Sequence, residues 1–256
     1  MEEFRIPTIF APKRRAQRVQ RARARQKSGR TAAARFVLDD IAEDMLERLA
    51  FLRHQPARAL VLGDITGPLG AALQAQGTQV ADARDIDLEA PWPTSSLDFI
   101  AVIGLIDAVN DLPGALIHIR NALAPGGLAI ASFVGGASLP ALRAAMLAAE
   151  PERPAARMHP LVDPRAAPQL LQRAGWKDPV VDTHTLTVRY GALGTLINDL
   201  RDQGLGCALA DAAAPLGKAA RARAQAAFAA RADDSGKTAE TFEIVTLTGR
   251  RSLAGT

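Results

Sequence analysis

The stretch that decides the fold reads ALVLGDITGPLGAALQAQGTQVADA and spans residues 59–83. It opens with a short, all-apolar run at 59–63, which is typical of a parallel strand buried by helices on both faces. A turn over 64–67 leads into a helix over 67–77 that ends on a glycine. A second strand follows over 78–83. Strand, glycine-containing turn, helix and strand together predict a βαβ unit with a right-handed crossover.

The rest of the chain repeats this alternation of strands and helices. Apolar positions three or four residues apart predict helices, and short apolar or alternating runs predict strands. Helices are expected over 31–53, 110–127, 138–153, 163–176, 192–204 and the Ala-rich stretch 207–232, and strands over 98–105, 128–136, 180–190 and, closing the sheet, 241–251. This order favours a doubly wound α/β fold, in which helices cover both faces of one mostly parallel sheet.

Composition excludes several classes of protein. Of the 256 residues 48% are hydrophobic, which is enough for a large core. No apolar run approaches the roughly 18–20 residues needed to cross a bilayer, and acids precede the first basic residues, opposite to a secretory signal. A cytoplasmic location without a membrane span is therefore expected. The single cysteine, Cys207, and four scattered histidines show no metal-ligand spacing, so neither a disulfide nor a metal site is expected.

The positive charge gathers near the N-terminus. No acid occurs between Glu3 and Asp39, and ten basic residues lie from position 13 to position 35: Lys13, Arg14, Arg15, Arg18, Arg21, Arg23, Arg25, Lys27, Arg30 and Arg35. We divide the chain into a basic arm over 1–35 and a domain over 36–256. The arm is read as a solvated helix or frayed segment, or as a surface that attracts phosphate or an acidic protein. Nucleic-acid binding is a further alternative, although the arm lacks the interleaved aromatics that stack on bases.

The turn after the first strand is the candidate ligand site. In open α/β sheets, ligands bind outside the carboxyl ends of the strands, near the point where the strand order reverses. Glycines in this turn, here Gly63 and Gly67, let the backbone approach the ligand closely. An acid at the end of the next strand, here Asp82, accepts the hydrogen bonds of a ribose diol. These features point to a nucleotide-like ligand.

Two stretches carry a family resemblance. VLGDITG at 61–67 resembles the DLGCGTG motif of the class I SAM-dependent methyltransferases. Residues 98–143, DFIAVIGLIDAVNDLPGALIHIRNALAPGGLAIASFVGGASLPALR, are similar to a branch of that family. The branch contains the mitochondrial complex I assembly methyltransferase-like factor and its bacterial relatives, and the malonyl carrier-protein methyltransferases are its cousins. The similarity continues through 169–190 and 196–204, and so covers nearly the whole chain.

The resemblance implies a class I methyltransferase fold with S-adenosyl-L-methionine (SAM) as cofactor. It places the backbone of Gly63, Asp64, Thr66 and Gly67 near the methionine moiety of SAM. It places Asp82 at the ribose. Asp85 or Asp87 would reach the adenine amino group.

The sequence also departs from the family pattern around this turn. Val61 replaces the acid of the first motif, and Ile65 replaces its central glycine. Asp64 stands in the place of a small residue and adds a negative charge near the carboxylate of SAM. Only fifteen residues separate Asp82 from Asp98, too few for the helix and strand that the family places there. We therefore expect a sheet that lacks one edge strand and its helix.

The sequence also departs from the family pattern near the expected substrate site. The branch commonly has a His-Trp pair just before VNDLP, where this chain has Asp107 and Ala108. Asp107 is then the only acid placed to act on a substrate, and it is our candidate catalytic residue. Methyl transfer can proceed by proximity and orientation with little acid or base assistance, so the missing pair is not decisive.

Three functions follow from these observations. The first is a SAM-dependent methyltransferase-like protein that acts on a protein or a small molecule. The alternative is a non-catalytic methyltransferase-fold scaffold, or respiratory-complex assembly factor, that binds a protein partner. Clustered departures at one pocket motivate this alternative. The third is an RNA-directed protein that uses the basic arm, whose phosphate contacts would make binding depend on salt.

Overall fold

The computed structural model describes residues 8–28, 33–83 and 86–253. These residues form one six-stranded sheet in the order β2-β1-β3-β4-β6-β5. The strands are β1 (Arg58–Leu62), β2 (Gln79–Ala81), β3 (Leu97–Ile103), β4 (Leu123–Val134), β5 (Lys177–Tyr190) and β6 (Thr238–Arg250). The helices are α1 (Pro12–Lys27), α2 (Phe36–Phe51), α3 (Pro68–Ala75), α4 (Leu112–Ala122), α5 (Pro140–Ala149), α6 (Ala167–Arg173), α7 (Leu193–Asp202) and α8 (Lys218–Ala229), with short 3-10 turns η1 (Ile106–Ala108) and η2 (Pro164–Ala166).

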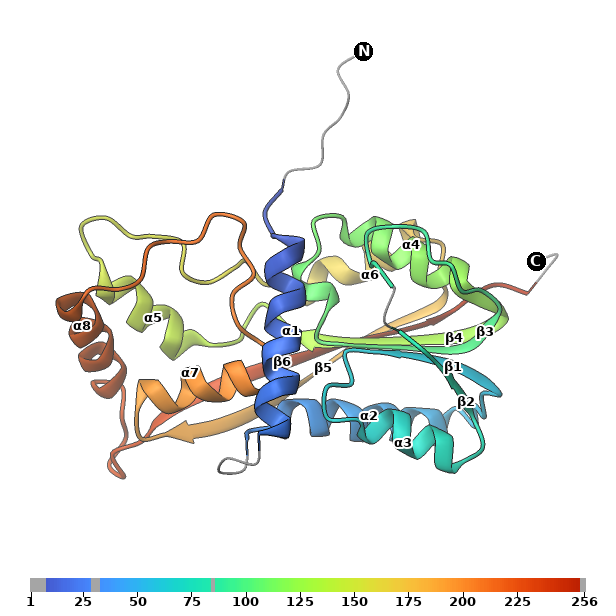
Figure 1. The fold of residues 1–256 in the computed structure, drawn as a ribbon, viewed down its shortest axis with the longest axis horizontal. Helices are drawn as coiled ribbons and strands as arrows, with labels where there is room; N and C mark the ends of the chain where they lie inside the picture. The colour runs from blue at the N-terminus through green and yellow to red at the C-terminus, as the bar shows by residue number, and fades with distance from the viewer. Residues whose placement is uncertain (1–7, 29–32, 84–85, 254–256) are drawn as a thin grey trace, which may run out of the picture.

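The strand directions confirm the predicted doubly wound sheet. β2, β1, β3 and β4 run parallel to one another, and β6 runs antiparallel to both β4 and β5. The reversed strand is thus the closing one that the sequence predicts over 241–251. The connection from β1 passes through α3, and the connection from β3 passes through α4 on the opposite face (Figure 1). The winding therefore reverses between the neighbouring strands β1 and β3.

The predicted loss of an edge strand is also confirmed. β2 forms one edge of the sheet, and the next strand in the chain, β3, pairs with the other side of β1. The described residues between Ala81 and Leu97 contain turns and bends but no helix or strand. A further parallel strand would need one crossover of at least a dozen residues to reach it and another to leave it, and the connection is too short for both.

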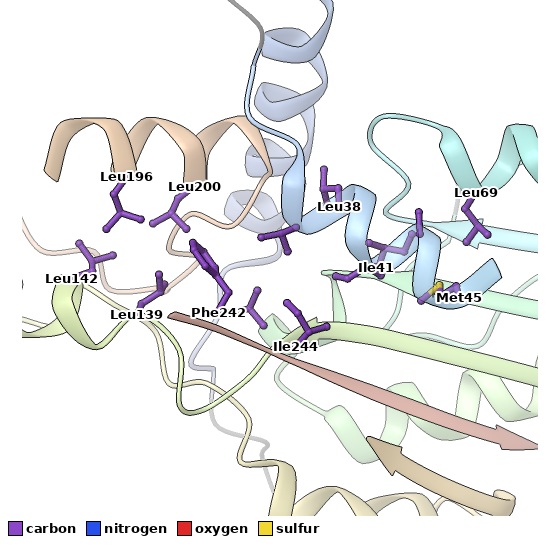
Figure 2. Packing of buried hydrophobic residues seen from close by; sticks show 14 of the residues in the cluster. Leu38, Ile41, Met45, Leu69, Leu139, Leu142, Leu196, Leu200, Phe242 and Ile244 are labelled. Atoms are coloured by element: carbon purple, nitrogen blue, oxygen red, sulfur yellow. The ribbon is translucent and has the colours of Figure 1, made fainter. Parts of the chain in front are cut away.

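The apolar runs are continuous because both faces of the sheet are buried. In β3, Phe99 and Ile103 face the cluster formed with α2, α3, α5, α7 and α8, whereas Ile100 and Val102 face the cluster formed with α4 and α6. This is the two-residue alternation of a strand with core on each side. Figure 2 shows the first cluster, where side chains of α2 and α7 converge on Phe242 of β6.

One helix prediction is wrong. The Ala-rich stretch 207–232 is helical only over α8, and the residues from 207 to 217 are not helical. Pro215 and Gly217 end the favourable run, since proline disfavours helical backbone in the residue before it and glycine weakens a helix interior. The extended part pairs instead with the start of the described chain, through a bridge between Phe10 and Leu209 and a hydrogen bond from Ala11 N to Ala208 O of 2.9 Å.

The basic segment folds as α1 and lies against the domain. Figure 1 shows α1 standing across the carboxyl ends of the parallel strands, next to α7. Two of its own residues are buried by this packing: Ala22 is fully buried, and Arg18 is only 7% exposed. The highly charged helix α1 can pack against the domain because three of its arginines, Arg15, Arg18 and Arg25, form ion pairs with acids of the domain. The division of the chain at residue 35 remains a prediction, but the helical part of the arm is packed.

Candidate functional site

Gly63, the first residue after β1, must be a glycine in this fold. Its φ is +80°, a region that other residues rarely adopt. A Cβ built there would lie 1.9 Å from Ile103 O, at the end of the neighbouring strand β3. The turn therefore holds the ends of β1 and β3 in direct backbone contact, at the point where the winding of the sheet reverses.

Asp64 serves the helix that follows the turn. Its carboxylate accepts hydrogen bonds from Gly67 N (3.1 Å) and Gly70 N (2.8 Å), so it caps the N-terminus of α3. Burial raises the pKa of Asp64 above its ordinary value, and the backbone hydrogen bonds only partly offset that rise. The end of α3 that could bind an anionic ligand group is thus filled by a side chain of the protein itself.

The cap leads to a prediction about stability. Asp64→Ala is expected to lower the free energy of unfolding by about 1 kcal/mol, the usual cost of losing a cap. Because the folded-state pKa is raised, proton binding favours the fold at low pH, and that advantage is lost as pH rises through the folded pKa. Asp64→Asn, which cannot titrate, should therefore gain stability relative to the parent from about pH 4 upward. Urea unfolding of both variants at pH 4 and pH 7 measures this, and a fixed difference would contradict it.

A cleft of about 570 Å³, here called the α1 cleft, opens beside Gly63. Its floor comes from the strand ends, and its roof comes from α1. The lining residues are Pro12, Arg15, Ala16, Val19, Gln20, Arg23, Leu62, Gly63, Asp82, Ala83, Ile86, Asp87, Leu88 and Leu105. The cleft lies at the reversal point between β1 and β3, where doubly wound folds bind ligands.

The structure gathers only part of the predicted cofactor site in this cleft. Gly63, Asp82 and Asp87 line it. Asp64, Thr66 and Gly67 lie outside its lining residues. Asp85 lies outside the described residues.

The rest of the turn faces other parts of the protein. Asp64 caps α3, and Ile65 approaches Gly204 from the loop after α7. The hydroxyl of Thr66 is buried without a hydrogen-bond partner. The residues of this turn are thus packed within the protein, and the α1 cleft is formed by residues around the turn.

Glu89, an acid that the sequence analysis does not single out, holds α1 in place over the α1 cleft. Glu89 accepts a hydrogen bond of 2.7 Å from Arg15 of α1, and its other oxygen accepts from the backbone N–H groups of Asn110 and Asp111. Burial acts to raise the pKa of Glu89, but Arg15 and the N–H groups outweigh it and hold the pKa below its ordinary value. Arg15 also donates to Ala108 O. Sequence reasoning missed Glu89 because it lies in an irregular loop with no motif.

Asp107, the candidate catalytic residue, sits in a buried ion cluster. Arg18 of α1 donates to both of its oxygens, at 3.1 and 3.3 Å, and to the carbonyl of Gly104 at 3.1 Å. His159 Nε2 lies 3.5 Å from Asp107 Oδ2. Burial acts to raise the pKa of Asp107, but Arg18 and His159 outweigh it and hold the pKa below its ordinary value. As placed, Asp107 is an ionised partner of Arg18, and Arg18 would have to withdraw before it could take a proton from a substrate.

Neither a metal cluster nor a membrane span appears in the described part of the chain. No group of three or more His, Cys, Asp or Glu side chains there has the geometry to hold a metal ion. None of the helices over residues 8–28, 33–83 and 86–253 is long and apolar enough to span a membrane.

Comparison with known proteins adds sequence relatives to this geometry. No protein-family model matches the chain. It is 28% identical over 237 residues to the malonyl-[acyl-carrier protein] O-methyltransferase of Halorhodospira halophila, covering 80% of this chain and 78% of that protein. It is 34% identical over 118 residues to the mitochondrial arginine-hydroxylase NDUFAF5 of Rattus norvegicus, covering 44% of this chain. The match spans only about a third of that relative's length (34%).

The match to a solved structure is of low similarity. The 1,6-didemethyltoxoflavin-N1-methyltransferase of Burkholderia thailandensis is 14% identical, with a TM-score of 0.46 over 94% of this chain and 91% of that one. At this level of likeness, the assignment depends on the sequence relatives and on the strand order. By sequence, this chain is similar to a malonyl-[acyl-carrier protein] O-methyltransferase over most of its length and to NDUFAF5 over less than half of it.

Proposed function

We propose that this protein binds SAM in the α1 cleft and acts as a SAM-dependent methyltransferase-like protein. The observation that carries the proposal is an open cleft at the reversal point, with Gly63 at its wall and Asp82 at its floor. Its volume of about 570 Å³ lies within the range of small-molecule sites. The sequence relative that matches most of this chain is by name an O-methyltransferase.

The roles of individual residues follow from their positions. The carboxylate of Asp82 would accept hydrogen bonds from the ribose hydroxyls, and the glycine at 63 would let the ligand approach the backbone. The methionine carboxylate of SAM cannot use the end of α3, because Asp64 occupies it. Arg23 of α1 lines the cleft and is the cation we assign to that carboxylate. Bound SAM would supply an electrophilic methyl group, while the protein contributes binding, orientation and exclusion of water.

The test is isothermal titration with SAM and with S-adenosylhomocysteine. The parent is expected to bind with a micromolar Kd, and Asp82→Ala to weaken binding at least about tenfold, since a lost hydrogen bond to a charged group costs about 1.5–3 kcal/mol. Asp234→Ala, an exposed acid remote from the cleft, is the matched control and should bind as the parent does. Unchanged affinity in the Asp82 variant would remove the assignment of Asp82 to the ribose. No binding at millimolar ligand would remove the proposal.

The non-catalytic scaffold is a second candidate because of the ion cluster at Asp107. Arg18 neutralises the one acid placed near a substrate, and Asp64 fills the end of α3. A scaffold of this kind would show no methyl transfer to any substrate, with or without SAM bound. A protein partner, a respiratory-complex assembly role and a cytoplasmic location belong to this proposal and stay predictions.

The RNA-directed alternative has less room than the sequence suggests. Arg15, Arg18 and Arg25 of the arm bind acids of the domain, so they are not available for phosphates. Binding of RNA that did not weaken with added salt would contradict a role for the arginines that remain.

A further inference from the structure

A second opening lies on the other side of α1. This basic groove, with a volume of about 710 Å³, runs between α1 and the end of α7. Its lining residues are Arg14, Gln17, Arg18, Arg21, Ala24, Arg25, Arg201, Gly204, Gly206 and Cys207. The four arginines of α1 recur at intervals of four, three and four residues, which places them on one face of the helix.

The groove keeps a positive charge after its internal ion pairs are counted. Arg18 is neutralised by Asp107, and Arg25 is neutralised by Asp202. Within residues 8–28, 33–83 and 86–253, no acid pairs with Arg14, Arg21 or Arg201. A concave site with unpaired guanidinium groups and no facing acid attracts small anions.

The only cysteine of the chain lies at the inner end of this groove. Cys207 is exposed toward the groove, and it also lines a small cavity of about 50 Å³ together with Asp107 and His159. The ring of Phe10 packs edge-on against His159 at 5.6 Å and helps to bury it. The thiol thus stands between a solvent-filled basic groove and a buried His–Asp pair.

The contacts of Cys207 stabilise its thiolate form. The side chain of His159 and the backbone N–H groups of Leu209 and His159 lie near its sulfur and favour the charged form. Burial acts to raise the pKa of Cys207, but these contacts outweigh it and lower the pKa below its ordinary value. For His159, burial acts to lower the pKa, but Asp107 and Cys207 outweigh it and raise the pKa. A cysteine beside a histidine whose Nε2 lies 3.5 Å from a buried carboxylate is an arrangement that favours an activated cysteine nucleophile.

We propose that Cys207 is a nucleophilic thiolate that reacts with small anionic disulfides admitted through the basic groove. In the reaction the Cys207 sulfur attacks one sulfur of the disulfide, so that a new S–S bond forms and the original S–S bond breaks. The departing half leaves as a thiolate and takes a proton from solvent. The product is a mixed disulfide on Cys207. This site is separate from the α1 cleft, and it does not depend on SAM binding.

Other charges face the thiol and enter its titration. Arg18 and Asp107 lie behind His159, Arg157 lines the small cavity, and Arg201 and Arg21 line the groove. Arg157 is held by Glu150 at 2.8 Å and so contributes little net charge. Titration of the reaction rate between pH 5 and 9 is therefore expected to report the Cys207–His159 pair.

The test measures the rate of thiol modification with two chromogenic disulfides. One is 5,5′-dithiobis(2-nitrobenzoate), which carries two carboxylates, and the other is neutral 4,4′-dithiodipyridine. Because the chain has one cysteine, each rate reports Cys207 alone. The rate is expected to change by less than about tenfold between pH 8 and pH 6, whereas an ordinary thiol of pKa about 8.5 would lose about 75-fold. An ordinary profile, or a thiol that reacts with neither reagent, would overturn the proposal.

Two variants test separately the activation of the thiol by His159 and the selection of anions by the basic groove. His159→Gln should restore the steep pH profile of an ordinary thiol with both reagents. Arg21→Gln combined with Arg201→Gln should slow the dianionic reagent about fivefold or more and leave the neutral reagent unchanged, since it removes two groove charges. The matched control, Arg143→Gln with Arg221→Gln, removes two exposed charges away from the groove and should change neither rate. If the variant with Arg21→Gln and Arg201→Gln reacted more slowly with both reagents to the same extent, the groove would not select anions. This outcome can be measured even if the His159 variant fails to fold.

Discussion

Replacing Asp107 by alanine is expected to destabilise the fold by about 3–5 kcal/mol, because it leaves the Arg18 guanidinium buried without its partner. Both side chains of the pair are at most 6% exposed, so water cannot substitute for the lost carboxylate. Arg18 also binds the carbonyls of Gly104 and Gly206, and these contacts hold the charge in place after the substitution. Urea unfolding at pH 7 measures the loss.

A matched control separates the buried pair from an ordinary one. Asp163 pairs with Arg165 at 2.7 Å on the surface, and Asp163→Ala should cost far less stability than Asp107→Ala, because solvent screens an exposed pair. The double variant Arg18→Met with Asp107→Leu should recover much of the stability, since it removes both charges together. A loss at Asp107 as small as the loss at Asp163 would show that Arg18 finds another partner or reaches solvent.

The loss at Asp107 should also depend on pH. The folded-state pKa of Asp107 lies below its ordinary value, so its contribution is complete at neutral pH and is lost as pH falls through the folded pKa. The stability of the parent and the Asp107→Ala variant should therefore converge below about pH 4. A difference that stays constant as pH falls well below 4 would contradict an ionised Asp107.

Replacing Gly63 by alanine is expected to cost about 3 kcal/mol or more and to abolish binding in the α1 cleft. The added Cβ would lie 1.9 Å from Ile103 O, so the ends of β1 and β3 must separate. The residue would also adopt a φ of +80°, which costs a residue with a side chain about 1–2 kcal/mol. Thermal unfolding and SAM titration of the variant measure both effects.

Gly67 is the control within the same turn. Its φ is +85°, but a Cβ there would meet no atom within 4 Å. Gly67→Ala should therefore cost only the backbone strain of about 1–2 kcal/mol and leave the strand ends in place. If the two variants lost the same stability, the contact between Gly63 and Ile103 would contribute nothing.

The departures from the family motif have a common structural explanation. With Asp64 capping α3 and Ile65 packed toward Gly204, the turn has become part of the core below α1. The cleft is instead walled by α1, whose Arg15 is fixed by Glu89. Asp64 and Ile65, which look like separate departures in the sequence, thus belong to one packed region beside α1.

The order of strands and helices follows from the sequence alone. Runs such as 59–63 and 98–105 are apolar on both alternating faces, and that pattern stabilises only a strand with core on each side. The short distance from Asp82 to Asp98 likewise predicts the missing edge strand, because chain length limits what a connection can contain. These properties depend on neighbouring residues and on chain length, so they can be predicted without knowing the tertiary contacts.

The tertiary structure alone decided which polar residues meet. Arg18 and Asp107 are 89 residues apart, and Arg25 and Asp202 are 177 apart, so no local pattern signals either pair. The basic segment therefore looked like a solvated arm, whereas these pairs dock it as a helix over the strand ends. Cys207 and His159 are likewise brought together only by folding. The strength of an ion pair or a hydrogen bond depends on burial and on the close approach of its two groups. The sequence shows which residue types are present but not which of them meet.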